Sequence, residues 1–567
     1  MLKPLKMVFG VVLFLLFVDP VLQILSEAEV FARAVDVDTA WVRRYNGTGN
    51  SLDFGRALAV DDSGYVYVTG RSQGTGTSDD YVTIKYHPDG DTAWVRTCNG
   101  SESSSDQACA IAVDAFGCVC VTGTIVNSGS GSDYGTIKYY PNGDTAWVRS
   151  YDGPANSSDV PYALAVDDSG YVYVTGSSYG TGTYADYATI KYHPDGDTVW
   201  VRRYNGSGNG SDAAHAMAVD GSGYVYVTGN SKGSVTWVDY ATIKYDPDGD
   251  TAWVRRFNWP TENSDDRASA ITVDGSGNVY VTGYTWDGTS YDYLTIKYDP
   301  DGDTAWVRRY DGPANEEDRA SAIAIDGFNN VYVTGHSDST GTYEDYATIK
   351  YDTGGNVLWV KRFNCANGTD KPYGLAVDGS NDVYVTGMSG CGGATSFDYV
   401  TIKYYSNGDT AWVARYHGPV ENGNDYAFAL ALDSAGNVYV TGKSDGSETG
   451  SDYCTIKYVQ THSDVEDETG DREKPSEFAL SQNYPNPFNP TTKIEFTLVK
   501  SDFVTLQIYD VLGRKVRTLV SEDLPSGYKS VFWDGKNDDG KEVASGVYFY
   551  QLKVGNFSEP KKMLLLK

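Results

Sequence analysis

Tryptophan recurs at a spacing of 53 residues along most of the chain. Eight of its 12 tryptophans follow this period: Trp41, Trp94, Trp147, Trp200, Trp253, Trp306, Trp359 and Trp412. A fixed period of this size is typical of a repeat protein, in which one supersecondary unit is copied along the chain. The spacing therefore predicts one structural unit repeated eight times.

Each unit holds four strand-like segments, seen clearly between residues 56 and 97. The apolar segment ALAVD is followed by the turn DDSG and by YVYVT, which is rich in β-branched and aromatic residues. A polar loop, the segment YVTIKY, the turn HPDGD and the segment TAWVRT complete the unit. Four short antiparallel strands, here named A to D, are typical of a β-propeller blade.

Length differences between units are confined to two of the four connections. The A–B and C–D turns keep a constant length, whereas the D–A and B–C loops vary. In a propeller these two pairs of connections lie on opposite faces. Since exposed loops of variable length usually carry function, the face formed by the D–A and B–C loops, here called the variable face, is the predicted working face.

The two ends of the repeat region complement each other. A lone D segment, VDTAWVRRY at 37–45, precedes the first full set, and no D segment follows the last strand C, DYCTIKY at 452–458. We therefore expect an all-β fold with an eight-bladed β-propeller over residues 35–458, closed by the N-terminal strand. Closure would leave no free sheet edge. An open or slipped ring is the alternative.

The repeated text GNVYVTG and DYxTIKYDPDGDxxW resembles the SBBP family of bacterial β-propeller repeats. The resemblance implies a secreted bacterial propeller and brings no defined activity. The family's name implies seven blades, whereas eight units are counted in this chain.

Residues 1–28 have the features of a secretory signal peptide. Lys3 and Lys6 precede the apolar segment MVFGVVLFLLFV, and small residues end the segment at Ala28. Cleavage after Ala34 and an uncleaved anchor are the alternatives. Because the apolar run is short and is interrupted, we expect no membrane span after cleavage.

Residues 459–477 are predicted to form an acidic linker, since they are charged and poor in apolar side chains. Residues 478–567 differ in composition: 12 Lys and Arg face ten Asp and Glu, against a net charge of −31 for the whole chain. Their strand-like runs predict an immunoglobulin-like β-sandwich.

The phrases NYPNPFNPTTKIEFTL, IYDVLGRKV, WDGKNDDGKEVASGVYFYQL and KKMLLLK resemble two related families. One is the type A C-terminal sorting domain of type IX secretion substrates, and the other is the immunoglobulin-like domain of flagellar hook-capping proteins. The resemblance implies export through secretion machinery that recognises 478–567, and a secreted or outer cell-surface location. A plain structural module is the alternative.

The acidic charge excludes one class of partner. A chain with a net charge of −31 and no basic patch repels nucleic acid, so no nucleic-acid partner is expected.

Of the seven cysteines, Cys365 and Cys391 are the best disulfide candidate, because both fall in variable-face loops of the same blade. For the four cysteines of the second blade, a disulfide or buried thiols are favoured over zinc.

Two aspartates recur in every unit on the variable face, one before strand A and one at the start of strand C. Sixteen carboxylates raise the possibility of Ca²⁺, but the repetition favours aspartates that bond the backbone of their own loops. We therefore expect no cofactor and no metal.

No catalytic motif is recognisable, and a histidine on the variable face, such as His215, His336 or His417, has no matching ligand pattern. We expect no enzyme.

The sharper signal is aromatic. Residues outside the tryptophan period place large rings in variable-face loops of blades three to six; the candidate ligand-binding set is Trp237, Trp259, Trp286, Tyr179, Tyr184, Tyr291 and Tyr343. Such rings stack on sugars or anchor protein partners, and packing against neighbouring loops is the alternative. The sequence thus predicts a non-enzymatic binding module for glycan or protein at the cell surface. A polysaccharide-acting enzyme with its site at the funnel and a purely structural envelope protein are the alternatives.

Overall fold

The computed structural model describes residues 35–462 and 478–566, apart from 76–77, 101–103, 128, 130, 260–263, 340–342, 366–367, 391–395, 482, 484–485, 487, 489–491, 525–526, 539–540 and 556. The chain divides into two compact units, Met1–Ser463 and Asp464–Lys567. Every regular element of the described part is a strand. Within that part no helix has the length and apolarity to cross a membrane. The predicted signal peptide, 1–28, lies outside the described residues.

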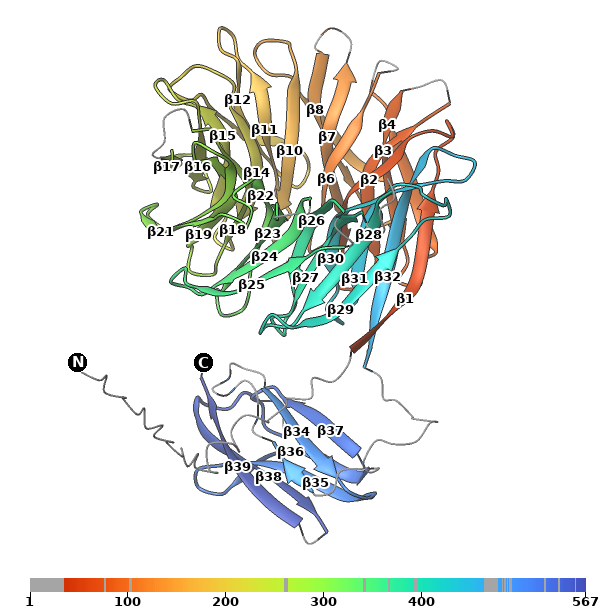
Figure 1. Cartoon of the computed structure of the whole chain (residues 1–567), viewed down its shortest axis with the longest axis vertical. Coiled ribbons are helices and arrows are strands. Elements are labelled where there is room, and N and C mark those ends of the chain that lie inside the picture. Colours follow the sequence, from red (N-terminus) through yellow and green to blue (C-terminus); the bar gives the residue numbers. More distant parts are fainter. Residues whose placement is uncertain are drawn as a thin grey trace, which may run out of the picture. The chain divides into compact units, whose positions relative to one another are not determined.

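The first unit consists of eight antiparallel sheets of four strands, which Figure 1 shows arranged around a ring. Blades one and two are β2 (Asp53–Val60), β3 (Val66–Gln73), β4 (Asp79–Tyr86), β5 (Thr92–Cys98) and β6 (Gln107–Val113), β7 (Val119–Asn127), β8 (Gly131–Tyr139), β9 (Thr145–Tyr151). Blades three and four are β10 (Asp159–Val166), β11 (Val172–Tyr179), β12 (Ala185–Tyr192), β13 (Thr198–Tyr204) and β14 (Ala213–Val219), β15 (Val225–Lys232), β16 (Val238–Tyr245), β17 (Thr251–Phe257).

Blades five and six are β18 (Asp266–Val273), β19 (Val279–Trp286), β20 (Tyr291–Tyr298), β21 (Thr304–Tyr310) and β22 (Asp318–Ile325), β23 (Val331–Ser337), β24 (Asp345–Tyr351), β25 (Val357–Phe363). Blades seven and eight are β26 (Asp370–Val377), β27 (Val383–Ser389), β28 (Asp398–Tyr404), β29 (Thr410–Tyr416) and β30 (Asp425–Leu432), β31 (Val438–Asp445), β32 (Ser451–His462), β1 (Val35–Tyr45). Each blade runs in the order A–B–C–D, and the A strands of neighbouring blades contact one another around the ring. The predicted eight blades are confirmed.

Strand β1 closes the ring by pairing antiparallel with β32, as the sequence predicted. The register runs from Val35 opposite His462 to Tyr45 opposite Tyr453. This pairing corrects one predicted boundary. Because β1 begins at Val35 and offers partners to residues 459–462, strand β32 takes in the first four residues of the segment predicted as linker, 459–477; the remaining residues, 463–477, lie outside the described part.

The repeat tryptophans lie where blades meet. Seven of the eight are buried, at 6–8% exposure. Tyrosine rings of the next blade pack against Trp41, Trp94, Trp147, Trp200, Trp253, Trp306 and Trp359. Trp147 Nε1 donates to the carbonyl oxygen of Pro194 at 3.0 Å, and the other repeat tryptophans make the equivalent bond to the C–D turn, or in blade seven to the Gln460 side chain. The 53-residue period therefore corresponds to one contact, the hydrogen bond that a tryptophan donates across each blade junction.

The second unit has two sheets, ordered β33-β34-β37 and β36-β35-β38-β39. Its strands are β33 (Ala479–Leu480), β34 (Thr492–Leu498), β35 (Asp502–Asp510), β36 (Lys515–Leu524), β37 (Gly527–Trp533), β38 (Gly546–Val554) and β39 (Phe557–Leu565). Alternating apolar residues of both sheets form one core around the fully buried Trp533. The predicted β-sandwich is confirmed.

Candidate functional site

The aspartate before each strand A acts as a loop clamp. Asp212, fully buried, accepts N–H bonds from Gly206 at 2.6 Å and from Lys232 at 2.7 Å, and so joins the D–A loop to the end of strand B. The equivalent Asp53, Asp106 and Asp159 make the same two contacts. Burial raises the pKa of Asp212. In blades one to four this aspartate therefore bonds the backbone of its own loop, as the sequence predicts.

A second position on this face varies from blade to blade. It lies two residues before the strand-C aspartate and is occupied, from blade one to blade eight, by Ser78, Gly131, Tyr184, Trp237, Ser290, Tyr343, Ser396 and Gly450. In blades three and four the loop that holds it is built alike: Gly180 N–H donates to Tyr184 O and Gly233 N–H donates to Trp237 O. Thr236 Oγ1 then donates to Asp239 at 2.8 Å. A fixed backbone therefore presents either an aromatic ring or a small side chain.

The aromatic rings at this position are open to solvent. Trp237 is 56% exposed, Tyr184 62% and Tyr343 69%. Lys232 Nζ lies 5.3 Å from the centre of the Trp237 ring, where a cation and an aromatic face attract each other. Tyr179, at the end of strand β11, is also exposed. Four of the seven predicted aromatics thus present rings to solvent on the loops of blades three, four and six.

The other three predicted aromatics, Trp259, Trp286 and Tyr291, are half-buried and packed. The Trp259 ring lies 6.4 Å from the Phe257 ring and beneath Arg309, and the backbone N–H of residue 259 donates to Asp266 Oδ2. Trp286 meets Tyr291 edge to face at 5.1 Å. For these three the packing alternative describes the geometry: Trp286 and Tyr291 flank the B–C loop of blade five and pack against each other, and Trp259, in the D–A loop before β18, packs against Phe257 and Arg309. Their predicted role in ligand binding remains a prediction.

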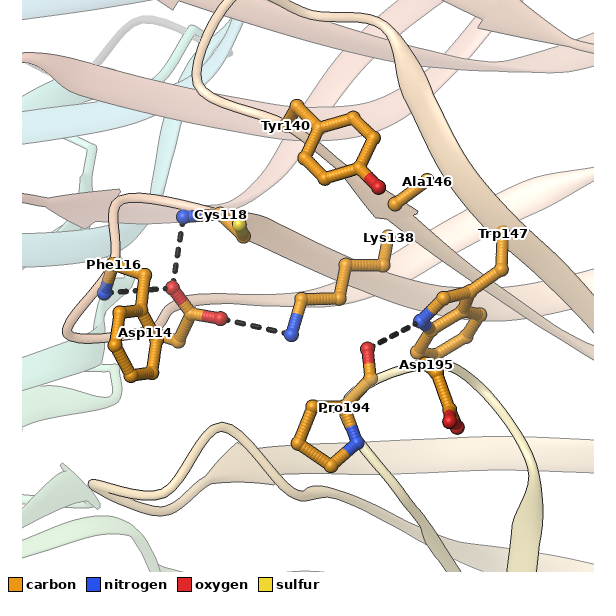
Figure 2. Close-up of a pocket in the computed structure, with 9 residues that line it drawn as sticks. All are labelled: Asp114, Phe116, Cys118, Lys138, Tyr140, Ala146, Trp147, Pro194 and Asp195. Atoms are coloured by element: carbon orange, nitrogen blue, oxygen red, sulfur yellow. Dashed lines mark hydrogen bonds and ion pairs between the residues drawn. The ribbon is translucent and has the colours of Figure 1, made fainter.

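A pocket that the sequence did not predict opens on the opposite face, between blades two and three (Figure 2). It has a volume of about 430 Å³ and is lined by Asp114, Phe116, Cys118, Lys138, Tyr140, Ala146, Trp147, Pro194 and Asp195. Lys138 Nζ pairs with Asp114 Oδ2 at 2.8 Å, with both side chains buried. Figure 2 shows this ion pair crossing the pocket, with Trp147 and Pro194 at one side.

Two substitutions account for the pocket. In blade one, Tyr65 and Tyr67 lie under Lys85, and Tyr67 Oη donates to Asp61 at 2.8 Å. Blade two has Cys118 and Cys120 at these positions. With both rings absent, space is left and Asp114 receives Lys138 in place of a tyrosine hydroxyl. The sequence signal of this pocket is the paired change from tyrosine to cysteine at positions 118 and 120.

The cysteines divide into free thiols and a disulfide. Cys98, Cys109, Cys118, Cys120 and Cys454 are free, and burial raises the pKa of the Cys118 thiol. In blade two, the buried-thiol alternative thus holds and the disulfide alternative does not. Cys365 is disulfide-bonded, while its predicted partner Cys391 lies outside the described residues.

Comparison with protein families supports both units. The family described as "Beta-propeller repeat" (SBBP) matches seven stretches: 40–76, 153–182, 199–235, 252–289, 309–341, 358–390 and 414–448. The longest interval between matched stretches, 77–152, includes blade two, whose sheet is nonetheless complete. The family described as "FlgD Ig-like domain" matches residues 486–556. A comparison with curated proteins gives no match.

Several solved structures are similar at low identity. One is described as PorZ, an essential bacterial surface component of the type IX secretion system of Porphyromonas gingivalis, with 13% identity, 90% of this chain and 81% of that chain covered, and a TM-score of 0.32. Another is the polysaccharide lyase Uly1, with 12% identity, 71% and 89% covered, and a TM-score of 0.36. Drosophila Plexin A in complex with Semaphorin 1b gives 10% identity, 74% and 86% covered, and 0.36. These scores are too low to carry an argument about function.

Proposed function

We propose that this chain, a β-propeller repeat protein of the SBBP type that ends in a FlgD Ig-like domain, is a secreted or cell-surface binding module for a glycan or a protein. The observation that carries the proposal is the exposed aromatic position of the B–C loops. The same loop bond holds Tyr184 and Trp237 in blades three and four and Ser78 and Gly450 in blades one and eight, and the exposed Tyr343 occupies the equivalent sequence position in blade six.

The chemistry of these rings suits recognition without reaction. An exposed aromatic ring offers a rigid apolar face that stacks on a sugar or fills a partner's pocket at small cost in side-chain entropy. The neighbouring carboxylates are engaged in structure: Asp239 pairs with Arg256 at 2.6 Å, and Asp212 accepts backbone N–H bonds. We therefore propose a non-enzymatic role.

The ends of the chain support a location outside the cell. The N-terminal segment has the pattern of a secretory signal, and the C-terminal sandwich resembles sorting domains of type IX secretion substrates as well as the FlgD Ig-like domain that it matches. We propose that secretion machinery recognises residues 478–567. The acidic surface of the chain favours solubility in that setting.

The test is retention of the full chain on a panel of insoluble polysaccharides and bacterial envelope fractions. A triple variant, Tyr184→Ser, Trp237→Ser and Tyr343→Ser, places the blade-one residue at all three positions. The matched control is Phe116→Ser, Tyr140→Ser and Phe328→Ser, which removes three exposed aromatics from the A–B and C–D turns of the other face. We expect the first variant to lose retention and the control to keep it. Equal retention by both folded variants would refute the proposal.

A further inference from the structure

Each blade junction on the variable face repeats one set of side chains. It consists of the strand-C aspartate, the residues three and five positions after the repeat tryptophan, and the aspartate before strand A of the next blade. The fifth position is occupied, in chain order, by Asn46, Asn99, Asp152, Asn205, Asn258, Asp311, Asn364 and His417. Differences between junctions can therefore be compared on a constant backbone.

In most junctions an arginine at the third position neutralises the strand-C aspartate. Four pairs have N–O distances between 2.6 and 3.0 Å: Arg44 with Asp452, Arg203 with Asp186, Arg256 with Asp239, and Arg362 with Asp345. Arg309 pairs with Asp292 in the same way. In these junctions the arginine guanidinium therefore occupies the position beside the strand-C carboxylate where a metal cation would otherwise bind.

The junction between blades seven and eight departs from this pattern. Arg415 directs its Nη2 to Cys365 Sγ, 2.8 Å away, instead of to Asp398. In its place His417 brings its Nδ1 to 3.1 Å from Asp398 Oδ1. Among the residues that the structure describes, no lysine or arginine forms an ion pair with Asp398. The disulfide-bonded Cys365 therefore holds the arginine away from the aspartate.

Asp425 completes the set from strand β30. It is fully buried, and its Oδ2 accepts an N–H bond from Gly418 at 2.7 Å. Its Oδ1 is buried, and the Ser444 side chain hydrogen-bonds to this carboxylate. At the same position in blades one to four, Oδ1 accepts an N–H from the end of strand B; here that N–H, of Asp445, donates to Asn424 O. Among the described residues, Oδ1 of Asp425 therefore accepts no backbone N–H bond, unlike its counterparts in blades one to four.

We propose that Asp398, His417 and Asp425 form a binding site for a divalent transition metal ion, with Zn²⁺ as its simplest occupant. One ligand atom from each lies within 4.8 Å of the other two. Two carboxylates and one imidazole are ligands that Zn²⁺ accepts, and they leave a further coordination position open. Ligand atoms around Zn²⁺ lie roughly 3.4 Å apart at bond lengths of about 2.0–2.2 Å. The exposed ring of His417 therefore has to close by on the order of 1 Å, which its loop position allows.

Two other junctions also bring three side chains together, but each of these clusters contains only aspartates. Asp292, Asp311 and Asp318 also converge, but Arg309 already pairs with the first two. Asp133, Asp152 and Asp159 form a cluster of carboxylates alone, and an acidic cluster without an imidazole is a weaker candidate for a transition metal. Only the blade-seven junction, of these three, combines an imidazole with the absence of a paired arginine.

The test is calorimetric titration of the full chain, without an affinity tag, with Zn²⁺. The variant His417→Asn introduces the residue that five other blades carry at this position, so we expect the metal-free fold and its unfolding midpoint to be unchanged. Wild type should bind one Zn²⁺ at this site, and the variant should bind it at least tenfold more weakly. Co²⁺ gives a second readout, since ligation by the site should produce visible absorption bands that the variant lacks.

Two controls separate this site from adventitious binding. Asp311→Asn alters the cluster that holds Arg309, and His193→Asn removes the exposed His193–Asp195 pair; both should bind Zn²⁺ as wild type does. The proposal is overturned if His417→Asn binds with wild-type affinity, if the loss follows His193→Asn instead, or if wild type shows neither heat of binding nor Co²⁺ absorption.

Discussion

Trp200 of strand β13 donates its Nε1 hydrogen to the carbonyl oxygen of Pro247, 3.3 Å away in the next blade. The same ring packs between Tyr173 of its own blade and Tyr245 of the next, with centroid distances of 6.4 and 6.0 Å. One side chain therefore joins two sheets by apolar burial and by a hydrogen bond. Because the contact recurs at every junction, the ring is held by a series of equivalent links.

We predict that Trp200→Ala destabilises the propeller by about 3–5 kcal/mol, the cost typical of truncating a buried tryptophan. The indole is only 6% exposed, and its loss also removes one of the two donors to the Pro247 carbonyl, the other being Lys191 Nζ. Chemical unfolding of wild type and variant gives the comparison, with Trp237→Ala as an exposed-tryptophan control that should unfold as wild type does. An unchanged midpoint for Trp200→Ala would contradict the junction described here.

Deleting residues 35–45 should open the ring. The deletion removes the whole of β1, including Trp41 and the Arg44–Asp452 pair, and exposes the edge of β32. Unpaired strand edges recruit other strands, so we expect a lower unfolding midpoint and aggregation, measured by calorimetry and light scattering. A synthetic peptide of residues 35–45 should restore both properties. A deletion variant as stable and monodisperse as wild type would contradict closure by β1.

Filling the blade-two pocket should stabilise the fold. In the double variant Cys118→Tyr and Cys120→Tyr, the second tyrosine can donate to Asp114 as Tyr67 does to Asp61. A satisfied hydrogen bond and two packed rings should add about 1–2 kcal/mol to the free energy of unfolding. Thermal unfolding measures the change. A lower midpoint would mean that the neighbours of the pocket have closed around the cysteines and no longer accommodate the rings.

Asp370 should give the stability a pH dependence of unusual sign. Burial raises the pKa of this carboxyl from 3.8 to about 6. The folded chain then binds the proton more tightly than the unfolded chain, so the free energy of unfolding falls as the pH rises from about 4 to about 6. An amide suits the site, because its oxygen can accept the Cys365 N–H and its nitrogen can donate to Ser389 Oγ.

Asp370→Asn should therefore match wild type near pH 4 and exceed it by about 2–3 kcal/mol at pH 7. Denaturant unfolding at a series of pH values measures the difference between the two proteins. If the two profiles run parallel across this interval, the carboxyl titrates alike in the folded and unfolded states, and burial has not raised its pKa.

The sequence predicted the propeller because its evidence is redundant. The tryptophan period, the turn chemistry and the complementary ends indicate one fold. Because the unit occurs eight times, an ambiguous strand assignment in one copy is resolved by the others. The end of β32 was missed by four residues, since polar residues such as Gln460 have strand partners only once β1 is known to lie beside them. Strand pairing between distant segments is not visible in local composition.

The site was less predictable. Counting aromatics on one face does not separate the exposed Trp237 from the packed Trp259, because exposure depends on loop length and on neighbours such as Arg309. When the repeats are aligned, Trp237 occupies the position two residues before the strand-C aspartate, whereas Trp259 lies in a D–A loop. The position of Arg415 could not be anticipated, since it depends on Cys365, 50 residues away in the chain.

The dissociation constant of a partner retained in the pull-down, measured for wild type and for Trp237→Ser, tests whether the exposed aromatic loops bind that partner. Loss of one stacked ring costs about 1–1.5 kcal/mol, so we expect a dissociation constant raised by about tenfold, while Phe328→Ser should leave it unchanged. An unchanged constant for Trp237→Ser, or an increase confined to Phe328→Ser, would contradict binding through the aromatic loops of the variable face.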